Sequence, residues 1–309
     1  MLSLGLNIYL VFRFHDNQNS GIVKENIPKY KLTNPLQKEN IDSNVESSDA
    51  VLHYSGLREI LESEIERFGA KENTGFFLQD IRTGAWLGVK EREGFNPASL
   101  LKIPLMMAML KKVKLDEISL DSTLEITEED LDKNSGRLHE KGVGYKMTVW
   151  DFIEEMILSS DNTAKNVLKR QLNDAELNSV FAHVGIPNPY SQSGDSLVTP
   201  RGYTRLFKSL YYSSYLSPEL SEKALEITTD TKMENLISAG IPYEIQVAHK
   251  YGERSNGLSD CGIVYHPQNA YFVCAMTRDM EIPQARDLIV SLSKIVYTFI
   301  SEKNTDLQN

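Results

Sequence analysis

The sequence has 309 residues and a formal net charge of −10 at pH 7, with 41% hydrophobic and 25% charged residues. These values are ordinary for a globular protein and supply enough apolar side chains for a sizeable core. The negative charge, without any dense basic run, argues against a nucleic-acid partner. Small molecules or cell-wall material fit better as substrates.

The chain starts with a stretch, 1–14, that is almost entirely apolar up to Arg13. This stretch is shorter than a standard membrane span and has no basic segment before it, so an uncleaved anchor, a weak signal peptide and the remnant of a longer start stay open. Export or membrane tethering is favoured over a structural helix or a mis-set start. Residues 15–50 are polar without apolar periodicity, which indicates a linker. We therefore expect a folded domain over 51–303 and a tail over 304–309.

The first elements of the domain are a helix and a hairpin. Residues 54–68 carry leucine, isoleucine and phenylalanine at helical spacing with charges between them, which predicts an amphipathic helix that ends near Gly69. Two β-prone runs follow over 75–81 and 85–90, and the turn residues 82–84 between them indicate a hairpin.

The remainder of the chain is helical in the middle and β-rich toward the end. Apolar periodicity predicts mostly helices between residues 111 and 240, over 147–158, 163–172, 174–184 and 200–212. Thr148 offers an N-cap for the first of these helices, although the cap could equally lie a residue away. Strands are predicted over 246–252, 261–266 and 270–278, before a closing helix over 283–301. Strands from both ends therefore enclose a helical middle, which requires the N- and C-terminal segments to lie side by side in one sheet.

The cysteines of the chain, Cys261 and Cys274, lie on either side of a predicted hairpin turn over 266–269. If Pro267 and Gln268 form a two-residue loop, the cysteines face each other across the strand pair. A disulfide stays open, but two buried thiols that pack as small apolar groups are preferred. No histidine or acid pattern near them indicates a metal site or a nucleophile.

A serine and a lysine stand at the head of the most apolar run of the chain, 100–110. Because apolar side chains cover every face of this run, it predicts a buried helix with Ser99 at its first turn. Residues three apart share a helix face, so the amine of Lys102 can reach the hydroxyl of Ser99. Free N–H groups at a helix start also favour an oxyanion, and the pair fits a nucleophile with its base. Pro104 should kink the helix slightly unless its lost hydrogen bond is absorbed in the first turn.

The Ser-x-x-Lys spacing is a weak signal by itself, since it is expected by chance about once in a chain of this size. Ser291 and Lys294 have the same spacing in what is predicted to be an ordinary amphipathic helix near the C-terminus. Other motifs must therefore support the catalytic interpretation.

Two further motifs follow in order along the chain. Ser160-Asp161-Asn162 comes directly after a predicted helix, where it is equally well explained as a plain helix cap. Lys250 and Gly252 lie on a predicted strand, where a lysine beside a glycine is commonplace. Only the order and spacing of the three motifs together favour a shared site.

Ser-x-x-Lys, then Ser-Asp-Asn, then Lys-x-Gly is the set of motifs associated with penicillin-recognising serine acyltransferases. Over roughly 51–301 the sequence resembles the class A β-lactamases and their penicillin-binding relatives. Further likenesses are Asn162-Thr163-Ala164 with Asn166, Val198-Thr199-Pro200 and Ser238 to Pro242. The resemblance implies an α+β fold with an antiparallel sheet, helices on its faces, a helical lobe and an active site in the cleft between them. It implies no cofactor and no metal.

The resemblance also implies a role for each motif residue. Ser99 would attack a strained or terminal amide carbonyl while Lys102 takes its proton, which requires an amine whose pKa is lowered by burial and by a second cation, Lys250. Ser160 would pass a proton to the departing nitrogen, and Asn162 would bind the substrate amide.

The predicted β-strand would complete the site. The backbone N–H groups of Ser99 and Glu253 would form the oxyanion hole. Lys250 would also attract the substrate carboxylate, and Tyr251 and Gly252 beside it would line the binding surface.

The sequence departs from the class A pattern where the deacylating glutamate is expected. The matching loop, 185–195, contains no glutamate, and Asp195 is its only acid. Glu176 falls upstream, in a predicted helix, and is interpreted as a solvated residue. Tyr251 replaces the usual threonine of the third motif, and Leu258 stands where many class A enzymes have an arginine.

We therefore expect a serine acyl-enzyme hydrolase, exported or tethered outside the membrane, that acts as a monomer on a β-lactam or a D-alanyl peptide. A weak β-lactamase and a cell-wall peptidase are both open, and the missing glutamate favours the second. The rivals are a non-catalytic domain that senses wall fragments or antibiotics, and a serine-dependent glutaminase or esterase.

Overall fold

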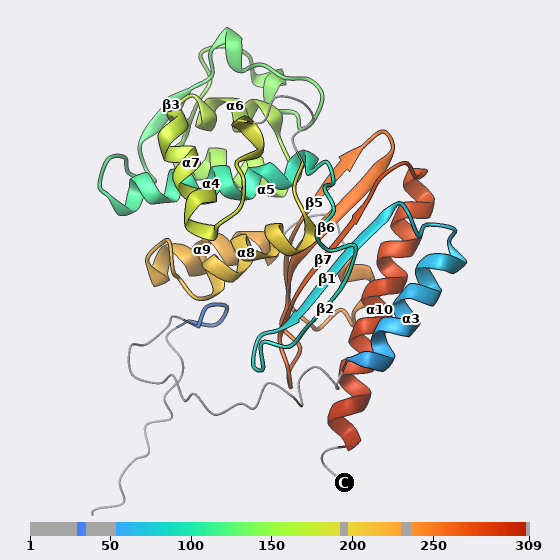
Figure 1. Cartoon of the computed structure of the whole chain (residues 1–309). Coiled ribbons are helices and arrows are strands. Elements are labelled where there is room, and N and C mark those ends of the chain that lie inside the picture. The colour runs from blue at the N-terminus through green and yellow to red at the C-terminus, as the bar shows by residue number, and fades with distance from the viewer. Residues whose placement is uncertain (1–29, 35–53, 192–196, 230–235, 307–309) are drawn as a thin grey trace, which may run out of the picture. The chain divides into compact units, whose positions relative to one another are not determined.

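The computed structural model describes residues 30–34, 54–191, 197–229 and 236–306 (Figure 1). The chain divides into the units Met1–Lys31 and Leu32–Asn309, and the second unit holds all the elements discussed below. The expected anchor or signal, 1–14, lies outside the described residues. Among the described residues, no helix has the length and the apolar character that crossing a membrane requires.

The core of the second unit is a five-stranded antiparallel sheet with the strand order β2-β1-β7-β6-β5. Its strands are β1 (Thr74–Asp80), β2 (Trp86–Val89), β5 (Val247–Arg254), β6 (Gly257–Val264) and β7 (Tyr271–Thr277). Strand β1 pairs with β7 along its whole length, so segments from the two ends of the chain are neighbours. This confirms the predicted α+β fold, and the turn between β1 and β2 confirms the predicted hairpin.

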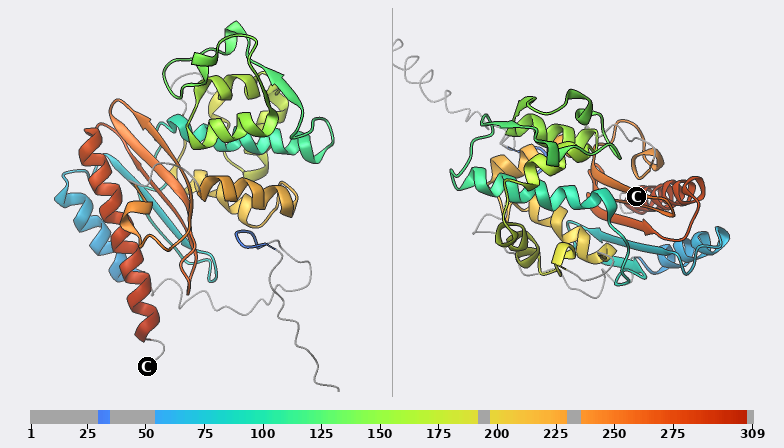
Figure 2. Two further views of the ribbon diagram at one scale, coloured as in Figure 1. Left: turned by 180° about the vertical axis from the view of Figure 1, so that it is seen from behind. Right: turned by 90° about the horizontal axis from the view of Figure 1, so that it is seen from above.

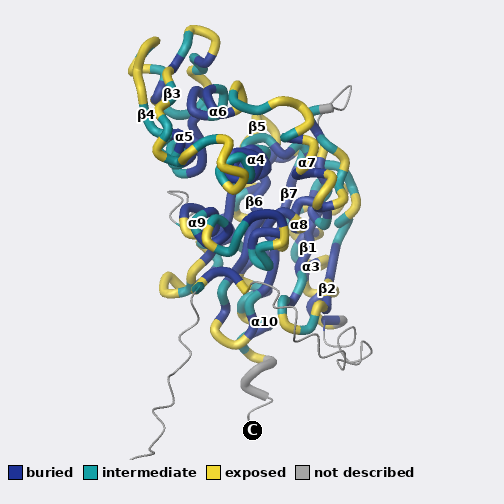
Figure 3. The backbone as a smooth tube through the Cα atoms, turned by 90° about the vertical axis from the view of Figure 1, so that its left-hand side faces the viewer, coloured by how far each residue is buried: buried dark blue, intermediate teal, exposed yellow. Residues whose placement is uncertain are grey.

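Both faces of the sheet are buried, which Figure 3 shows as dark blue strands. Along β7, Phe272 and Cys274 point into the core beneath the helical lobe, whereas Tyr271 and Val273 point into the opposite core. Helices α3 (Ser55–Arg67) and α10 (Ile282–Asp306) cover this second face side by side (Figures 1 and 2). The alternation follows from the two-residue period of a strand with a core on each side.

The helical lobe covers the other face. It contains α4 (Lys102–Lys114), α5 (Val149–Leu158), α6 (Asn162–Lys169), α7 (Asp174–Val184), α8 (Pro200–Tyr211) and α9 (Pro218–Thr229). Thr148 caps α5 as predicted. Its hydroxyl accepts the N–H of Asp151, and the Asp151 carboxylate accepts the N–H of Thr148. The lobe also contains a strand pair, β3 (Thr123–Glu125) and β4 (Lys146–Thr148), and the 3₁₀ turns η2 (Glu128–Asp130), η3 (Leu138–Lys141), η4 (Pro189–Ser191) and, ahead of β5, η5 (Ser238–Gly240). The sequence did not predict this small sheet.

Helix α4 is the buried helix that the apolar run predicts, and every residue from Lys102 to Leu110 is buried. A 3₁₀ turn, η1 (Ala98–Leu101), leads directly into it. Pro104 is the third residue of α4, where the backbone N–H has no partner within the helix in any case. The hydrogen bond that a proline lacks is therefore not missed at this position.

The prediction that the two cysteines pack as free thiols is wrong. Cys261 and Cys274 lie directly opposite each other in β6 and β7, as the hairpin argument predicts, but they form a disulfide rather than two packed thiols. Side chains directly opposite on one face of an antiparallel pair have their β-carbons close enough for this bond. The connection between the strands also spans residues 265–270 instead of two.

A short part of the expected linker is held against the domain. The carboxylate of Glu222 on α9 accepts the N–H of Leu32 at 2.9 Å, and the N–H of Thr33 at 2.8 Å. Leu32 and Thr33 are both buried. The linker prediction did not include this contact, and most of 15–50 lies outside the described residues. At the other end, α10 continues to Asp306, past the point where the tail over 304–309 was expected.

Candidate active site

Ser99 lies on η1, one turn before α4. The residue before it, Ala98, has a φ of 45°, a left-handed conformation that is unfavourable for an alanine. The carboxamide oxygen of Asn96 accepts the Ala98 N–H at 3.0 Å and so supports this turn. The sharp turn sets Ser99 at the head of the buried helix, as the sequence predicts.

The Lys102 amine connects the Ser99 hydroxyl to the Ser160 hydroxyl. The amine of Lys102 lies 3.1 Å from Ser99 Oγ and 3.0 Å from Ser160 Oγ, and it also donates to the Ser160 carbonyl. Only 2% of the Lys102 surface is exposed. One buried amine thus bridges two hydroxyls from separate parts of the chain.

Burial, together with the positive charges of Lys250 and Lys165, lowers the pKa of Lys102 to about 7. Removing an ammonium from water disfavours its charged form, and neighbouring cations act in the same direction. Near pH 7, a large fraction of this amine is therefore neutral and able to accept a proton. This property suits a general base.

The Ser160-Asp161-Asn162 motif joins α5 to α6 and serves two purposes. Asp161 is a helix cap, because its carboxylate accepts the N–H of Ala164 at 2.8 Å. Ser160 has a φ of 51°, and its carbonyl accepts the Ser135 hydroxyl at 2.8 Å. The capping explanation is right for Asp161, while Ser160 and Asn162 line the cavity at Ser99.

Strand β5 passes very close to the nucleophile. A β-carbon added at Gly252 would lie 2.4 Å from the Pro97 carbonyl oxygen and 3.1 Å from the Ser99 nitrogen. Only a glycine allows this approach. Because β5 is an edge strand, alternate N–H groups point away from the sheet, which is what the oxyanion role expected for Glu253 requires.

The cavity at Ser99 has a volume of about 480 Å³. Five of the residues predicted from the motifs line it, namely Ser99, Ser160, Asn162, Tyr251 and Glu253. Its wall also contains residues that the sequence analysis missed, namely Asn134, Ser135, Arg254, Ser255 and Ile282. Arg254 lies two residues after the third motif, and Asn134 with Ser135 precede a glycine turn. These signals in the sequence are weak, and only the structure shows that the residues line the cavity.

Lys250 is not part of the cavity wall. It is completely buried, and burial lowers its pKa to about 8. Its amine has no hydrogen-bond partner in the described part of the chain, and it lies 4.2 Å from the centre of the Tyr251 ring. Tyr251, the residue that replaces the usual threonine, lines the cavity and so lies between the cavity and the buried Lys250 amine. Leu258 is buried in the core shared with α3 and α10.

The described part of the loop offers no deacylating acid. Glu253 is the one carboxylate in the described cavity wall, and Asp195 lies outside the described residues. Glu176 is not simply solvated, since it completes the N-terminal capping box of α7 and forms an ion pair with Lys112. The Tyr190 hydroxyl donates to the Leu101 carbonyl at 3.3 Å, and burial raises the Tyr190 pKa.

The fold and the Ser–Lys–Ser cluster indicate a serine hydrolase of the β-lactamase type. The β-lactamase enzyme family model matches residues 57–300. The chain therefore belongs to the β-lactamase enzyme family and is a hydrolase, which confirms the resemblance noted from its motifs.

Individual relatives agree with this assignment. The β-lactamase of Bacillus subtilis (strain 168) is 26% identical over 250 residues, which cover 72% of this chain and 78% of the relative. The β-lactamase of Bacillus licheniformis is 26% identical over 249 residues, which cover 75% and 80%.

Solved structures show the same fold. A mutant of PBP-A, in an acyl-enzyme complex with penicillin G, is 25% identical with a TM-score of 0.74, and the match covers 80% of this chain and 97% of that one. A variant of the last common ancestor of the class A β-lactamases of Gram-negative bacteria is 25% identical with a TM-score of 0.71, and the match covers 81% and 100%.

Proposed function

We propose that Ser99 forms an acyl-enzyme with β-lactams or with D-alanyl peptides, and that the acyl group leaves slowly. One observation carries the first half of this proposal. The buried Lys102 amine lies within hydrogen-bond distance of Ser99 Oγ and has a lowered pKa. A neutral amine in this position is what activation of a serine requires.

The contacts suggest a path for the proton. Lys102 accepts it from the Ser99 hydroxyl as Ser99 attacks the amide carbon. Because Lys102 also contacts the Ser160 hydroxyl, the proton can pass to Ser160 and from there to the departing nitrogen. In a β-lactam this step opens the ring, and in a peptide it releases the terminal D-alanine. The backbone N–H groups of Ser99 and Glu253 receive the developing oxyanion, and Asn162 binds the substrate amide.

Recognition of the substrate carboxylate differs from the arrangement implied by the motifs. Lys250 acts on the site through its charge, which lowers the Lys102 pKa. A direct contact between Lys250 and a carboxylate requires the Tyr251 ring to turn aside. Arg254 lines the same cavity with an exposed side chain and is available to bind the carboxylate instead. Its guanidinium now donates to Asn96 at 3.1 Å.

The described cavity wall supports the proposed slow release of the acyl group. A hydrolytic water needs a general base within direct reach or one water away, and such a base contributes about 10²- to 10⁴-fold to the rate. This factor corresponds to about 3 to 5 kcal/mol of barrier. Glu253, the carboxylate in the described wall, is exposed on an edge strand. A long-lived acyl-enzyme favours a penicillin-binding peptidase over an efficient β-lactamase.

The proposed substrates place the protein outside the cytoplasm, where β-lactams and peptidoglycan peptides are found. The apolar stretch 1–14 supports export and a possible tether. A monomer suffices, because residues of one chain supply every group named above.

Penicillin G and a chromogenic cephalosporin test the proposal. We expect intact-mass analysis to show one covalent adduct that persists for many minutes, with turnover of the cephalosporin far slower than its acylation. The absence of any adduct would contradict the proposal. Fast turnover would make the protein a β-lactamase. Unchanged ligand affinity of the Ser99→Ala variant, with no adduct on the wild type, would indicate a non-catalytic sensor, and ammonia release from glutamine would indicate a glutaminase.

A further inference from the structure

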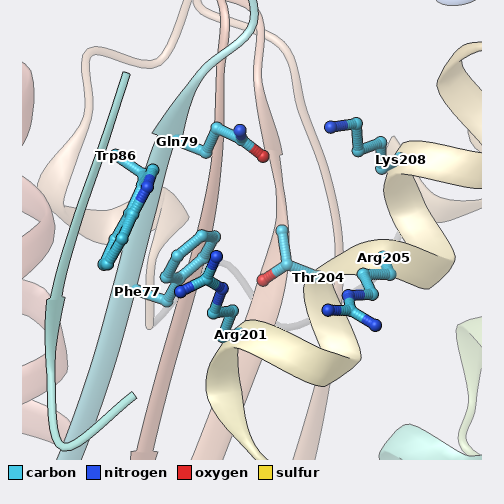
Figure 4. A pocket seen from close by; sticks show the side chains of 7 residues that line it. All are labelled: Phe77, Gln79, Trp86, Arg201, Thr204, Arg205 and Lys208. Atoms are coloured by element: carbon cyan, nitrogen blue, oxygen red, sulfur yellow. The ribbon is translucent and has the colours of Figure 1, made fainter. Parts of the chain in front are cut away.

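A second cavity lies at the opposite edge of the sheet from β5. It has a volume of about 190 Å³, and Figure 4 shows the side chains that line it from β1, β2 and α8. None of them lines the cavity at Ser99. The strand order places β1 and β2 at one side of the sheet and β5 at the other, so the two cavities are separate sites.

Three cationic side chains of α8 line this cavity. Arg201, Arg205 and Lys208 are spaced by four and three residues, which puts them on one helix face. None of them forms an ion pair within the described residues. In a chain with 43 acidic and 33 basic residues, three neighbouring cations without a carboxylate partner are unexpected. Partial burial lowers the pKa of Lys208, and the charge of Arg205 contributes a smaller part through repulsion, which a bound anion would relieve.

Aromatic rings hold Arg201 in a fixed position. Its guanidinium carbon lies 4.3 Å from the centre of the Trp86 ring and 5.9 Å from that of Phe77. Its Nη1 atom is buried and has no hydrogen-bond partner in the described part of the chain. A stacked guanidinium keeps its planar edge free, and that edge matches a carboxylate or a phosphate. A buried donor without a partner is costly, so a ligand that accepts its hydrogen bond would be stabilised there.

The other two cations frame the site from the same helix. Arg205 donates to the Gly185 carbonyl at 2.9 Å, which fixes its guanidinium near the end of α7. Lys208 reaches from α8 toward Gln79, as Figure 4 shows. Arg201 and Arg205 also line an adjoining cavity of about 260 Å³ together with Arg92. Arg92 is paired with Glu91 at 3.3 Å, so Arg201 and Arg205 are the cations without an ion pair in this adjoining cavity among the described residues.

We propose that this second cavity binds a small oxyanion ligand with at least two negative charges, either a phosphate or a carboxylate compound. Arg201 would hold one acid group through its free edge, and Lys208 would hold the other. Charge-assisted hydrogen bonds of this kind are among the stronger polar contacts in proteins. The volume suits a compact molecule rather than a polymer.

The chain offers a built-in reporter and a matched control. It contains two tryptophans, Trp86 in the cavity and Trp150 on α5. Trp150 also has a cation beside it, since the Lys223 amine lies 3.8 Å from its ring centre, but it lines none of the cavities described here. The variant Trp150→Phe therefore leaves Trp86 as the only tryptophan whose fluorescence can respond.

The test titrates pyrophosphate and citrate into the full-length Trp150→Phe protein at constant ionic strength. We expect a saturable change in Trp86 emission with at least one of them, which also distinguishes phosphate from carboxylate recognition. Lys208→Gln should weaken binding by about tenfold or more, which is the effect of losing one charge-assisted contact. Lys223→Gln should leave it unchanged.

Two results would overturn the proposal. One is no saturable response to either probe, or the same response to sodium chloride at equal ionic strength. The other is unchanged binding in both Lys208→Gln and Arg201→Gln. Lys208 has an exposed side chain, so its variant is expected to fold even if the Arg201 variant does not. Acylation of Ser99 by penicillin G should be unaffected in Lys208→Gln, which keeps this test independent of the proposed function.

Discussion

Two Ser-x-x-Lys pairs in this chain have the same spacing, but the lysine is buried in one pair and exposed in the other. In the pair at the head of α4, the Lys102 amine is buried and lies 3.1 Å from Ser99 Oγ. In the pair on α10, Lys294 is exposed, and the Ser291 hydroxyl donates to Glu64 instead. Helical spacing makes a serine and a lysine neighbours, but burial and a second cation give the amine its chemistry.

The largest expected effect separates the two serines. Ser99→Ala should abolish covalent modification by penicillin G, because Ser160, the other hydroxyl in contact with the Lys102 amine, is proposed to transfer a proton and not to attack the substrate. Ser291→Ala should acylate at the wild-type rate. Intact-mass spectrometry of both variants measures this, and a Ser99→Ala protein that still gains the adduct would remove Ser99 from its role.

The two lysines provide the next comparison. Lys102→Met keeps the buried volume but removes the base, and we expect the acylation rate to fall by about 10²- to 10⁴-fold. Lys294→Met should change it by less than about twofold, because the removed charge is exposed and distant from any proton transfer. Stopped-flow measurement of the acylation rate of both variants tests this prediction. Similar rates for both variants would mean that Lys102 is not the base.

A pair of glycines tests the approach of β5 to the nucleophile. Gly252→Ala would place a methyl group 2.4 Å from the Pro97 carbonyl oxygen and push the strand away from Ser99. Displacing a catalytic group by about 1 Å can cost about 10²-fold, so we expect acylation to slow by about 10- to 100-fold. Gly56→Ala on α3 meets no atom within 4 Å and should leave the rate unchanged. An active Gly252→Ala variant would show that the strand tolerates the shift.

Over a single pH unit, the pH dependence should give the smallest effect. The Lys102 pKa is lowered to about 7, so the amine is neutral above this pH and becomes protonated below it. A protonated amine cannot accept a proton from Ser99. The acylation rate should therefore level off above about pH 7 and fall by about tenfold for each unit below it. A rate that is flat from pH 5 to pH 8 would contradict a lysine base with this pKa.

The sequence predicts the fold well where the signals are local. Apolar periodicity located most strands and helices, and Thr148 was correctly expected as a cap. The small sheet of β3 and β4 was missed because its strands have three residues each, too few for a period to show. The contact of Glu222 with Leu32 joins residues that are 190 positions apart, and no local pattern encodes it.

The sequence predicted the candidate active site in part. The motifs identified Ser99, Lys102 and Ser160, and the structure brings these residues into contact. They did not show that the Tyr251 ring lies against the Lys250 amine, because side chains on one strand can turn over its free edge. Spacing gave the register of Cys261 and Cys274, yet the disulfide itself depends on how closely β6 and β7 approach.

The most direct test of the comparison is the location of the penicillin adduct. The wild-type protein is incubated with penicillin G at pH 8, where the Lys102 amine is mostly neutral, then digested and mapped by tandem mass spectrometry. We predict a single penicilloyl group on Ser99 and an unmodified Ser291. An adduct on Ser291, or on any residue other than Ser99, would contradict the claim that burial beside Lys102 makes this serine the nucleophile.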